Sequence, residues 1–173
     1  TNNDAINSVT LQYSGNATVA ANTTAGTYSG GIIASAASGT GLGNYNISYS
    51  AGTLTVNKAT LTVNADNQTK VYGNANPTLT ETITGFVNGE TIAVVSGTPT
   101  ATTTATNATG IAGATITAST SGLSTTNYDF VAGSNGTLTI TARPLTLTAN
   151  NQSTTYGTAL PLGTSAYTIS SGS

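Results

Sequence analysis

The chain has 173 residues, of which only three are basic and five acidic, giving a net charge of −2. So little positive charge cannot neutralise a phosphate backbone, which argues against nucleic acid as a partner. Histidine and cysteine are absent, so the usual general base and thiolate metal ligands are missing, and we expect no enzyme, no metal site and no cofactor. No apolar run has the length of a membrane span, so we expect no membrane insertion by this segment.

Threonine and asparagine supply most of the polar character, with 39 and 18 residues respectively. Threonine is β-branched and suits the wet face of a strand without adding charge. A flexible linker has a similar composition. However, ATLTVNA (59–65) alternates apolar with polar residues, which is typical of half-buried strands. We therefore predict an all-β fold.

The predicted strands follow one another at short intervals from GTLTV at 52–56 onward. The candidates lie near 59–65, 68–72, 78–84, 91–96, 99–104, 111–118, 127–132, 136–141 and 144–149. The segment NGETIAVVSG (88–97) is the one place for a short helix, since Glu90 favours a helix start and Gly97 a stop. Its Ile and Val residues favour a strand.

An internal repeat is the strongest signal in the sequence. A shift of 84 residues superposes GTLTVNKATLTVNADNQTKVYGNANP (52–77) on GTLTITARPLTLTANNQSTTYGTALP (136–161) without a gap. Upstream of these, GNYNI (43–47) corresponds to TNYDF (126–130) with a shift of 83. A period of this length suits an independent small β-domain better than a solenoid unit.

The repeat predicts three parts of the chain. Residues 58–142 form a complete unit, 1–57 the closing part of an upstream unit, and 143–173 the opening part of the next. We expect the chain to be a piece of a longer polypeptide. The one- to three-residue connections between units predict stiff junctions.

The set KATLTV, ADNQTKVYGNANPTLT, GFVNGET, NYDF and GTLTIT resembles the MBG-type repeat of large bacterial surface adhesins. The resemblance covers the complete unit and both flanking parts. It implies tandem small β-domains, sandwich-like or β-grasp-like, strung end to end in an extracellular or cell-surface chain. It supplies no catalytic residues.

The recurring residues are interpreted as structural. They are Tyr72, Gly73, Pro77, Asn127 and Tyr128, with Tyr156, Gly157 and Pro161 in the next unit. The tyrosine before glycine is expected to pack at a strand end, although an exposed ring that stacks on a sugar is the alternative. The glycine is expected to supply a turn with positive φ, and the proline to set the entry to the next strand. The pairs Asn44-Tyr45 and Asn127-Tyr128 predict braced turns with inward rings.

The charged residues do not recur, since Lys58 corresponds to Ala142 and Lys70 to Thr154. A site that every unit needed would keep its charge. We therefore predict a structural stalk of a secreted or surface-anchored adhesin, active in cell adhesion and biofilm, whose partners are neighbouring repeats and a host or matrix glycan or protein. The alternative is a glycan- or mucin-binding module that uses the loop GFVNGE (85–90), with Phe86 as an apolar anchor.

Overall fold

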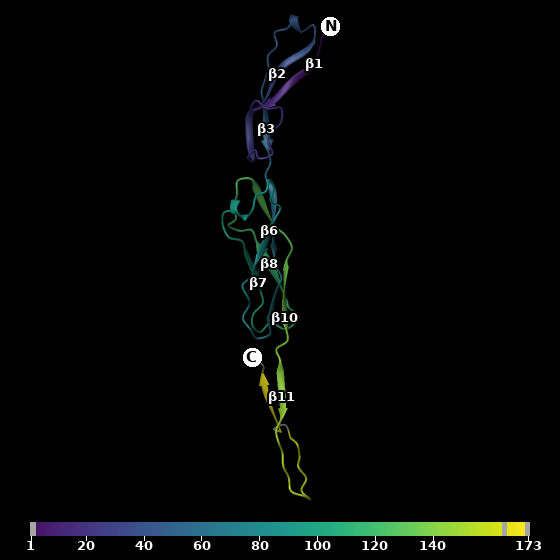
Figure 1. The fold of residues 1–173 in the computed structure, drawn as a ribbon, viewed down its shortest axis with the longest axis vertical. Coiled ribbons are helices and arrows are strands. Elements are labelled where there is room, and N and C mark those ends of the chain that lie inside the picture. Colours follow the sequence, from purple (N-terminus) through teal and green to yellow (C-terminus); the bar gives the residue numbers. More distant parts are fainter. Residues whose placement is uncertain (1–2, 164–165, 172–173) are drawn as a thin grey trace. The chain divides into compact units, whose positions relative to one another are not determined.

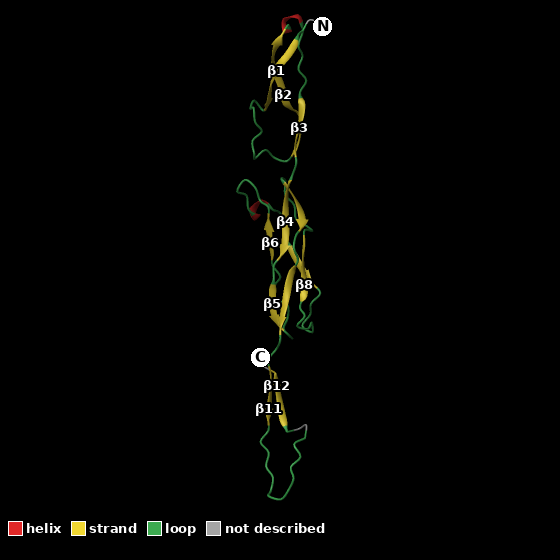
Figure 2. Cartoon of the chain, turned by 90° about the vertical axis from the view of Figure 1, so that its right-hand side faces the viewer, coloured by secondary structure: helices red, strands yellow, loops and turns green. Residues whose placement is uncertain are grey.

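The computed structural model describes residues 3–163 and 166–171, and it is an all-β protein (Figures 1 and 2). The chain packs as two compact units. The first comprises Thr1–Val63, Ile83–Pro99 and Thr120–Ala132, and the second Asn64–Thr82, Thr100–Ser119 and Gly133–Ser173. These units reflect packing alone, so the repeat boundaries at 57/58 and 142/143 stay a prediction.

The first unit contains two three-stranded sheets. In one, β1 (Ala5–Tyr13), β2 (Gly26–Thr40) and β3 (Gly52–Val56) lie in that order and are antiparallel. The other has the order β6-β4-β9. Its strands are β4 (Ala59–Ala65), β6 (Glu81–Thr84) and β9 (Tyr128–Ala132), of which β4 and β6 run on into the second unit. Strands β4 and β9 are parallel, and Ala59 pairs with Tyr128.

The second unit contains a four-stranded sheet and a hairpin-like pair. The sheet has the order β5-β10-β8-β7, with β5 (Gln68–Val71), β7 (Thr100–Thr103), β8 (Ala114–Ser119) and β10 (Gly136–Thr141). Strand β10 runs parallel to β5 and antiparallel to β8. Strands β11 (Leu145–Ala149) and β12 (Tyr167–Ser171) form a separate antiparallel pair.

The buried side chains of each unit come from alternate positions of its strands. In the first unit Leu61, Val63 and Tyr128 are buried, and in the second Ile116 and Leu138 are. Thr137 and Thr139, on either side of Leu138, are exposed, and Thr62, between Leu61 and Val63, is half-buried. The period-two pattern that the sequence analysis used thus separates core from solvent in β4 and β10, as expected for half-buried strands.

The predicted strands are confirmed, with one exception. Residues 91–96 contain a short 3-10 helix, η2 (Ile92–Val94), instead of a strand. The Thr91 hydroxyl accepts a hydrogen bond from Ala93 N at 3.4 Å and caps the turn. Ile92 is exposed, and the segment belongs to no sheet of the described residues. The strand prediction was wrong here because β-branched residues favour a strand only when a neighbouring strand accepts them. A second 3-10 turn, η1 (Leu42–Asn44), lies between β2 and β3.

The glycine that opens GTLT has a different role in its two occurrences. A Cβ at Gly136 would lie 2.4 Å from the carbonyl oxygen of Asp66, whereas at Gly52 the nearest atom, Cβ of Ile32, would be 3.5 Å away. The first distance is a clash with backbone, which cannot rotate aside as a side chain does. The close approach of β10 to the chain after β4 therefore requires a glycine.

We predict that Gly136→Ala destabilises the chain by about 1–3 kcal/mol, because the backbone must shift to admit the methyl group. Gly52→Ala is the matched control and is expected to change the free energy of unfolding by less than about 0.5 kcal/mol. Urea unfolding followed by circular dichroism measures both. Equal effects of the two substitutions would show that the close approach at Gly136 is not required.

Candidate functional site

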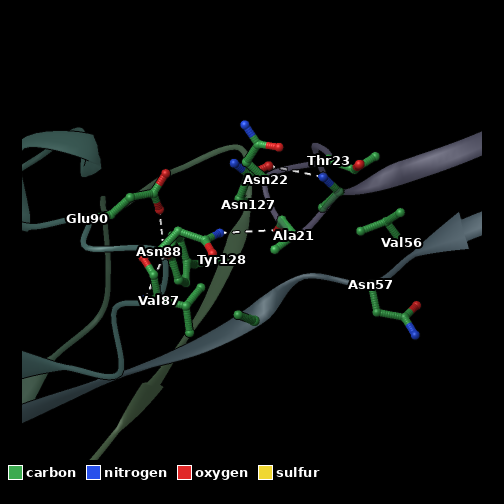
Figure 3. Close-up of a pocket in the computed structure, with 12 residues that line it drawn as sticks. Ala21, Asn22, Thr23, Val56, Asn57, Val87, Asn88, Glu90, Asn127 and Tyr128 are labelled. Atoms are coloured by element: carbon green, nitrogen blue, oxygen red, sulfur yellow. Dashed lines mark hydrogen bonds between the residues drawn. The ribbon is translucent and has the colours of Figure 1, made fainter. Parts of the chain in front are cut away.

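The candidate site is a small cavity in the first unit, where a loop of the N-terminal segment lies against two loops of the central repeat (Figure 3). Its volume is about 110 Å³. The lining residues come from the loop before β2, the end of β3, the start of β4, the loop after β6 and the start of β9: Ala21, Asn22, Thr23, Ala25, Val56, Asn57, Ala59, Val87, Asn88, Glu90, Asn127 and Tyr128.

A tight turn at Val87–Glu90 forms one wall of the cavity. Glu90 N donates to Val87 O at 3.0 Å, and the two central residues, Asn88 and Gly89, have φ values of 55° and 72°. Positive φ at both central positions is the type I′ geometry that Asn-Gly favours. The sequence NG thus fixes this turn locally, and the turn carries the Glu90 carboxylate toward Tyr128 (Figure 3).

Tyr128 is the buried aromatic residue of the site, with only 2% of its surface exposed. Its hydroxyl accepts a hydrogen bond from Val87 N at 3.1 Å and donates one to the Glu90 carboxylate. Its ring meets the ring of Phe86 edge to face, with centroids 5.9 Å apart. The hydrogen bond to Glu90, and then burial, raise the pKa of Tyr128 above its ordinary value. The predicted inward ring is confirmed for Tyr128. The same prediction was wrong for Tyr45, which is 58% exposed and whose hydroxyl donates a hydrogen bond to the Asp4 carboxylate.

Two asparagines fasten the N-terminal segment to the central repeat. Oδ1 of Asn127 accepts a hydrogen bond from Ala25 N at 3.0 Å, and Nδ2 of Asn88 donates to Ala21 O at 3.2 Å. The backbone carbonyl of Asn127 also accepts from Ala59 N at 2.9 Å. The sequence predicted that Asn127 braces its own turn, but its side chain reaches a residue 102 positions away. No local pattern in the sequence signals that contact.

Several polar groups that line the cavity are hydrogen-bonded to other residues of its lining. Ligand pockets commonly have volumes of about 300–1,000 Å³, so a cavity of about 110 Å³ has room for water but not for a sugar ring. Phe86, the apolar anchor of the glycan-binding alternative, is half-buried against Tyr128. The ring of Phe86 therefore packs partly inward against Tyr128, and its role as an apolar anchor stays a prediction. The arrangement serves to join two segments.

The tyrosine-glycine pairs Tyr72-Gly73 and Tyr156-Gly157 differ from expectation in one respect. The Gly73 and Gly157 φ values are 88° and 83°, which confirms the positive φ expected of both. Tyr72, however, is 44% exposed and Tyr156 fully exposed, so the prediction of packed rings was wrong. The backbone of Tyr72 makes the contacts instead, since its N donates to Thr141 O at 2.9 Å and its O accepts from Nε of Arg143 at 2.8 Å.

Pro77 and Pro161 lie in the loops that follow the two tyrosine-glycine pairs. Pro77 is half-buried and Pro161 exposed, and both precede residues outside any strand. Strand β6 begins only at Glu81, so the entry role predicted for Pro77 stays a prediction. Arg143 also binds the side-chain oxygen of Asn74. This bond joins the start of the next unit to the turn that follows Tyr72-Gly73.

Lys70 is a buried cation whose burial was not predicted from the sequence. It is 7% exposed, and its Nζ donates to Asn74 O at 3.3 Å, to Oδ1 of Asn76 at 2.8 Å and to Thr106 O at 2.6 Å. Nδ2 of Asn76 donates in turn to Ala105 O at 2.7 Å. Three oxygen acceptors compensate the burial of the charge. Gln68 and Lys70 are alternate residues of β5 on its more buried face. This spacing was the sequence signal that could have predicted the burial of Lys70.

Two general properties complete the description. Among residues 3–163 and 166–171, no group of three or more acidic side chains gathers in a way that would hold a metal ion. None of the helices in this part of the chain has the length and apolarity needed to cross a bilayer.

The comparison with protein families identifies the central repeat. Residues 61–139 match the family model of the MBG domain, YGX type. This match begins within β4, ends within β10 and includes the pair Tyr72-Gly73. No curated protein and no solved structure matches the chain.

We predict that Tyr128→Phe lowers the thermal midpoint at neutral pH, because Val87 N and Glu90 lose their partner. The raised pKa means that the folded state keeps the Tyr128 proton where the unfolded chain loses it, so the free energy of unfolding falls as the pH rises above about 10. This alkaline fall is expected to be smaller in Tyr128→Phe.

The control for this experiment is Tyr156→Phe, which removes a fully exposed hydroxyl. It is expected to follow the wild type at every pH. If Tyr128→Phe also followed the wild type through the alkaline range in denaturant titrations, the proposed coupling to Glu90 would be contradicted.

For Lys70 we predict that Lys70→Met costs roughly 2–3 kcal/mol of stability, because three part-buried hydrogen bonds to oxygen acceptors are lost. Lys58→Met is the matched control. Lys58 is exposed and forms a surface ion pair with Asp129 at 3.6 Å, which contributes about 0–1 kcal/mol. Guanidinium unfolding midpoints compare the two, and a similar loss in both would contradict a special role for Lys70.

Proposed function

We propose that the chain is a stalk segment of an extracellular bacterial adhesin, because residues 61–139 match the model of the MBG domain, whose family suggests a bacterial surface-protein repeat module. In this proposal its three parts belong to successive domains of a tandem array. The array spaces a binding tip from the cell surface and transmits tension. It needs no cofactor and no catalytic residue.

The observation that carries the proposal is the parallel pairing of opening with closing strands. Strand β4 pairs in parallel with β9, and β5 with β10. A chain that enters and leaves a sheet on parallel strands does so at opposite ends of that sheet. Antiparallel pairing would return the chain to its entry side. Parallel pairing therefore suits a series of domains under tension.

The direction of the strands also decides how tension acts on the hydrogen bonds. A pull on the N-terminal side of β5 and on the C-terminal side of β10 moves the two strands along each other. Four paired positions, from Leu138-Gln68 to Thr141-Val71, then share the load in shear. The slanted, evenly spaced bonds of a parallel ladder must break together in this geometry.

The junctions support the same proposal. On one side Asn127 and Asn88 bind the loop 21–25, and on the other Arg143 binds Tyr72 and Asn74. These bonds involve neutral amides or one guanidinium, so salt screening affects them little compared with a network of exposed ion pairs. They limit rotation about connections that are only a few residues long.

Force spectroscopy tests this proposal. Because the chain lacks cysteine, cysteines can be introduced at two chosen positions as attachment points. With handles at Asn7→Cys and Tyr167→Cys, we expect the central repeat to unfold in one step at high force. The matched control has handles at Thr69→Cys and Thr139→Cys, which are opposite each other in the β5·β10 ladder. Pulling there separates the strands sideways and is expected to need a lower force.

Equal unfolding forces in the two geometries would contradict the tension-bearing role. A glycan array probed with the same chain addresses the alternative of a glycan- or mucin-binding module. Specific binding that survives Val87→Ser would place the binding site elsewhere on the chain, and specific binding of any kind would give the segment a function beyond spacing.

A further inference from the structure

The chain contains two asparagine-glycine pairs, Asn88-Gly89 and Asn135-Gly136. The side-chain amide of an asparagine can react with the backbone nitrogen of the next residue, and a glycine there has no side chain to hinder the approach. Asparagine is accordingly among the thermolabile residues of proteins. Both pairs lie within residues 61–139, the segment that matches the MBG model. The structure gives them opposite surroundings.

The pair Asn88-Gly89 forms the tip of the turn at Val87–Glu90. Both residues are exposed, and a Cβ at Gly89 would meet no atom within 4 Å. Within the described part of the chain, Gly89 N donates no hydrogen bond. Two bonds close the turn and hold its tip, from Glu90 N to Val87 O at 3.0 Å and from Asn88 Nδ2 to Ala21 O at 3.2 Å (Figure 3). Local opening of this turn therefore costs little.

The pair Asn135-Gly136 is restrained on all sides. Gly136 is buried and is the first residue of β10, and a Cβ there would lie 2.4 Å from the carbonyl oxygen of Asp66. The backbone nitrogens of Ser134 and Thr137, on either side of the pair, donate to asparagine side chains at 2.9 and 2.7 Å. A reaction at this pair would require the start of β10 to leave its sheet.

We propose that Asn88-Gly89 is a site of spontaneous deamidation, that the fold protects Asn135-Gly136 from the same reaction, and that each event at Asn88 loosens the attachment of the N-terminal loop 21–25. The turn then acts as a slow, irreversible change built into the joint between two segments. This modification occurs whether or not the chain is part of a stalk.

The reaction needs only the chain and water. Gly89 N gives its proton to a base in the solvent and attacks Cγ of Asn88, which closes a succinimide ring, and the amide nitrogen takes up a proton and leaves as ammonia. Water then adds to either ring carbonyl and breaks its bond to the ring nitrogen. The product is aspartate, or isoaspartate in which the backbone continues through Cγ. In sum, one water is consumed, one ammonia is released and the amide NH₂ becomes OH.

Either product removes a contact with the N-terminal loop. The Asn88 Nδ2 donor to Ala21 O is lost, and a carboxylate oxygen that only accepts hydrogen bonds takes its place. The new charge also lies two residues from the Glu90 carboxylate and repels it. In isoaspartate an additional carbon enters the backbone and distorts the turn. The loop then keeps the bond from Ala25 N to Oδ1 of Asn127 at 3.0 Å, without the support of the second one.

Peptide mapping of the aged full chain compares the two sites. The protein is kept in warm, mildly alkaline buffer and then cleaved after glutamate, which releases residues 82–90, a peptide in which Asn88 is the only asparagine. Fragmentation of the peptide that begins at Thr91 locates any change at Asn135. Deamidation is read from the mass gain of the amide-to-acid exchange, and isoaspartate from methylation by an isoaspartyl methyltransferase. We expect Asn88 to react at least about tenfold faster than Asn135.

The same chain in concentrated urea is the control for the intrinsic reactivity of the two pairs. There the fold no longer protects Asn135, and we expect similar rates at both sites. Equal rates in the folded chain, a faster reaction at Asn135, or an Asn88 that reacts in urea but not in the folded chain would overturn the proposal.

Hydrogen exchange measured by NMR tests the loosening of the loop. Asn88→Asp carries the aspartate product from the start, and Asn135→Asp is the matched control, because it adds the same charge at an exposed residue. We expect the amide of Ala25 to exchange roughly two- to tenfold faster in Asn88→Asp, the change that follows the loss of one hydrogen bond. It is expected to keep the wild-type rate in Asn135→Asp. An unchanged rate in Asn88→Asp, or an equal increase in both variants, would contradict the loosening.

Discussion

Parallel pairing between the first and last strands of the central repeat is the constraint on which the rest of the structure depends. The partners are about 70 residues apart in β4·β9 and in β5·β10, so neither opening strand meets its parallel partner until β9 and β10 are in place. Leu61 of β4 and Leu138 of β10 are both fully buried. Non-local pairing of this kind makes the repeat close as a whole.

The core of the described chain is small, and side-chain hydrogen bonds to distant backbone groups supplement it. Oδ1 of Asn64 accepts from Ser134 N at 2.9 Å, and Oδ1 of Asn67 accepts from Thr137 N at 2.7 Å. The carboxylate of Asp66 accepts from the hydroxyls of Thr80 and Thr82. These contacts use neutral amides and hydroxyls almost throughout, which explains why a stable arrangement needs so few charges. The same bonds hold loops that have few apolar side chains to bury.

One geometric feature underlies the stalk proposal. The parallel pairing of β4 with β9, and of β5 with β10, passes the chain from one end of each sheet to the other. Leu145 and Leu147 are the counterparts of the buried Leu61 and Val63, and each is 60% exposed. In the proposed tandem array, later strands of the same chain would cover these leucines.

The sequence by itself determined the all-β class, the bounds of β4 and β10, the positive φ of Gly73 and Gly157, and the inward ring of Tyr128, because alternation, turn chemistry and a repeat are local or self-referential signals. Only the tertiary structure decided that Tyr72 is partly exposed, that Phe86 packs on Tyr128, that residues 92–94 form a 3-10 turn, and that Lys70 is buried. Each of these depends on which distant backbone or ring comes within reach. Pairing between strands 70 residues apart sets that proximity, and no window of the sequence contains both partners.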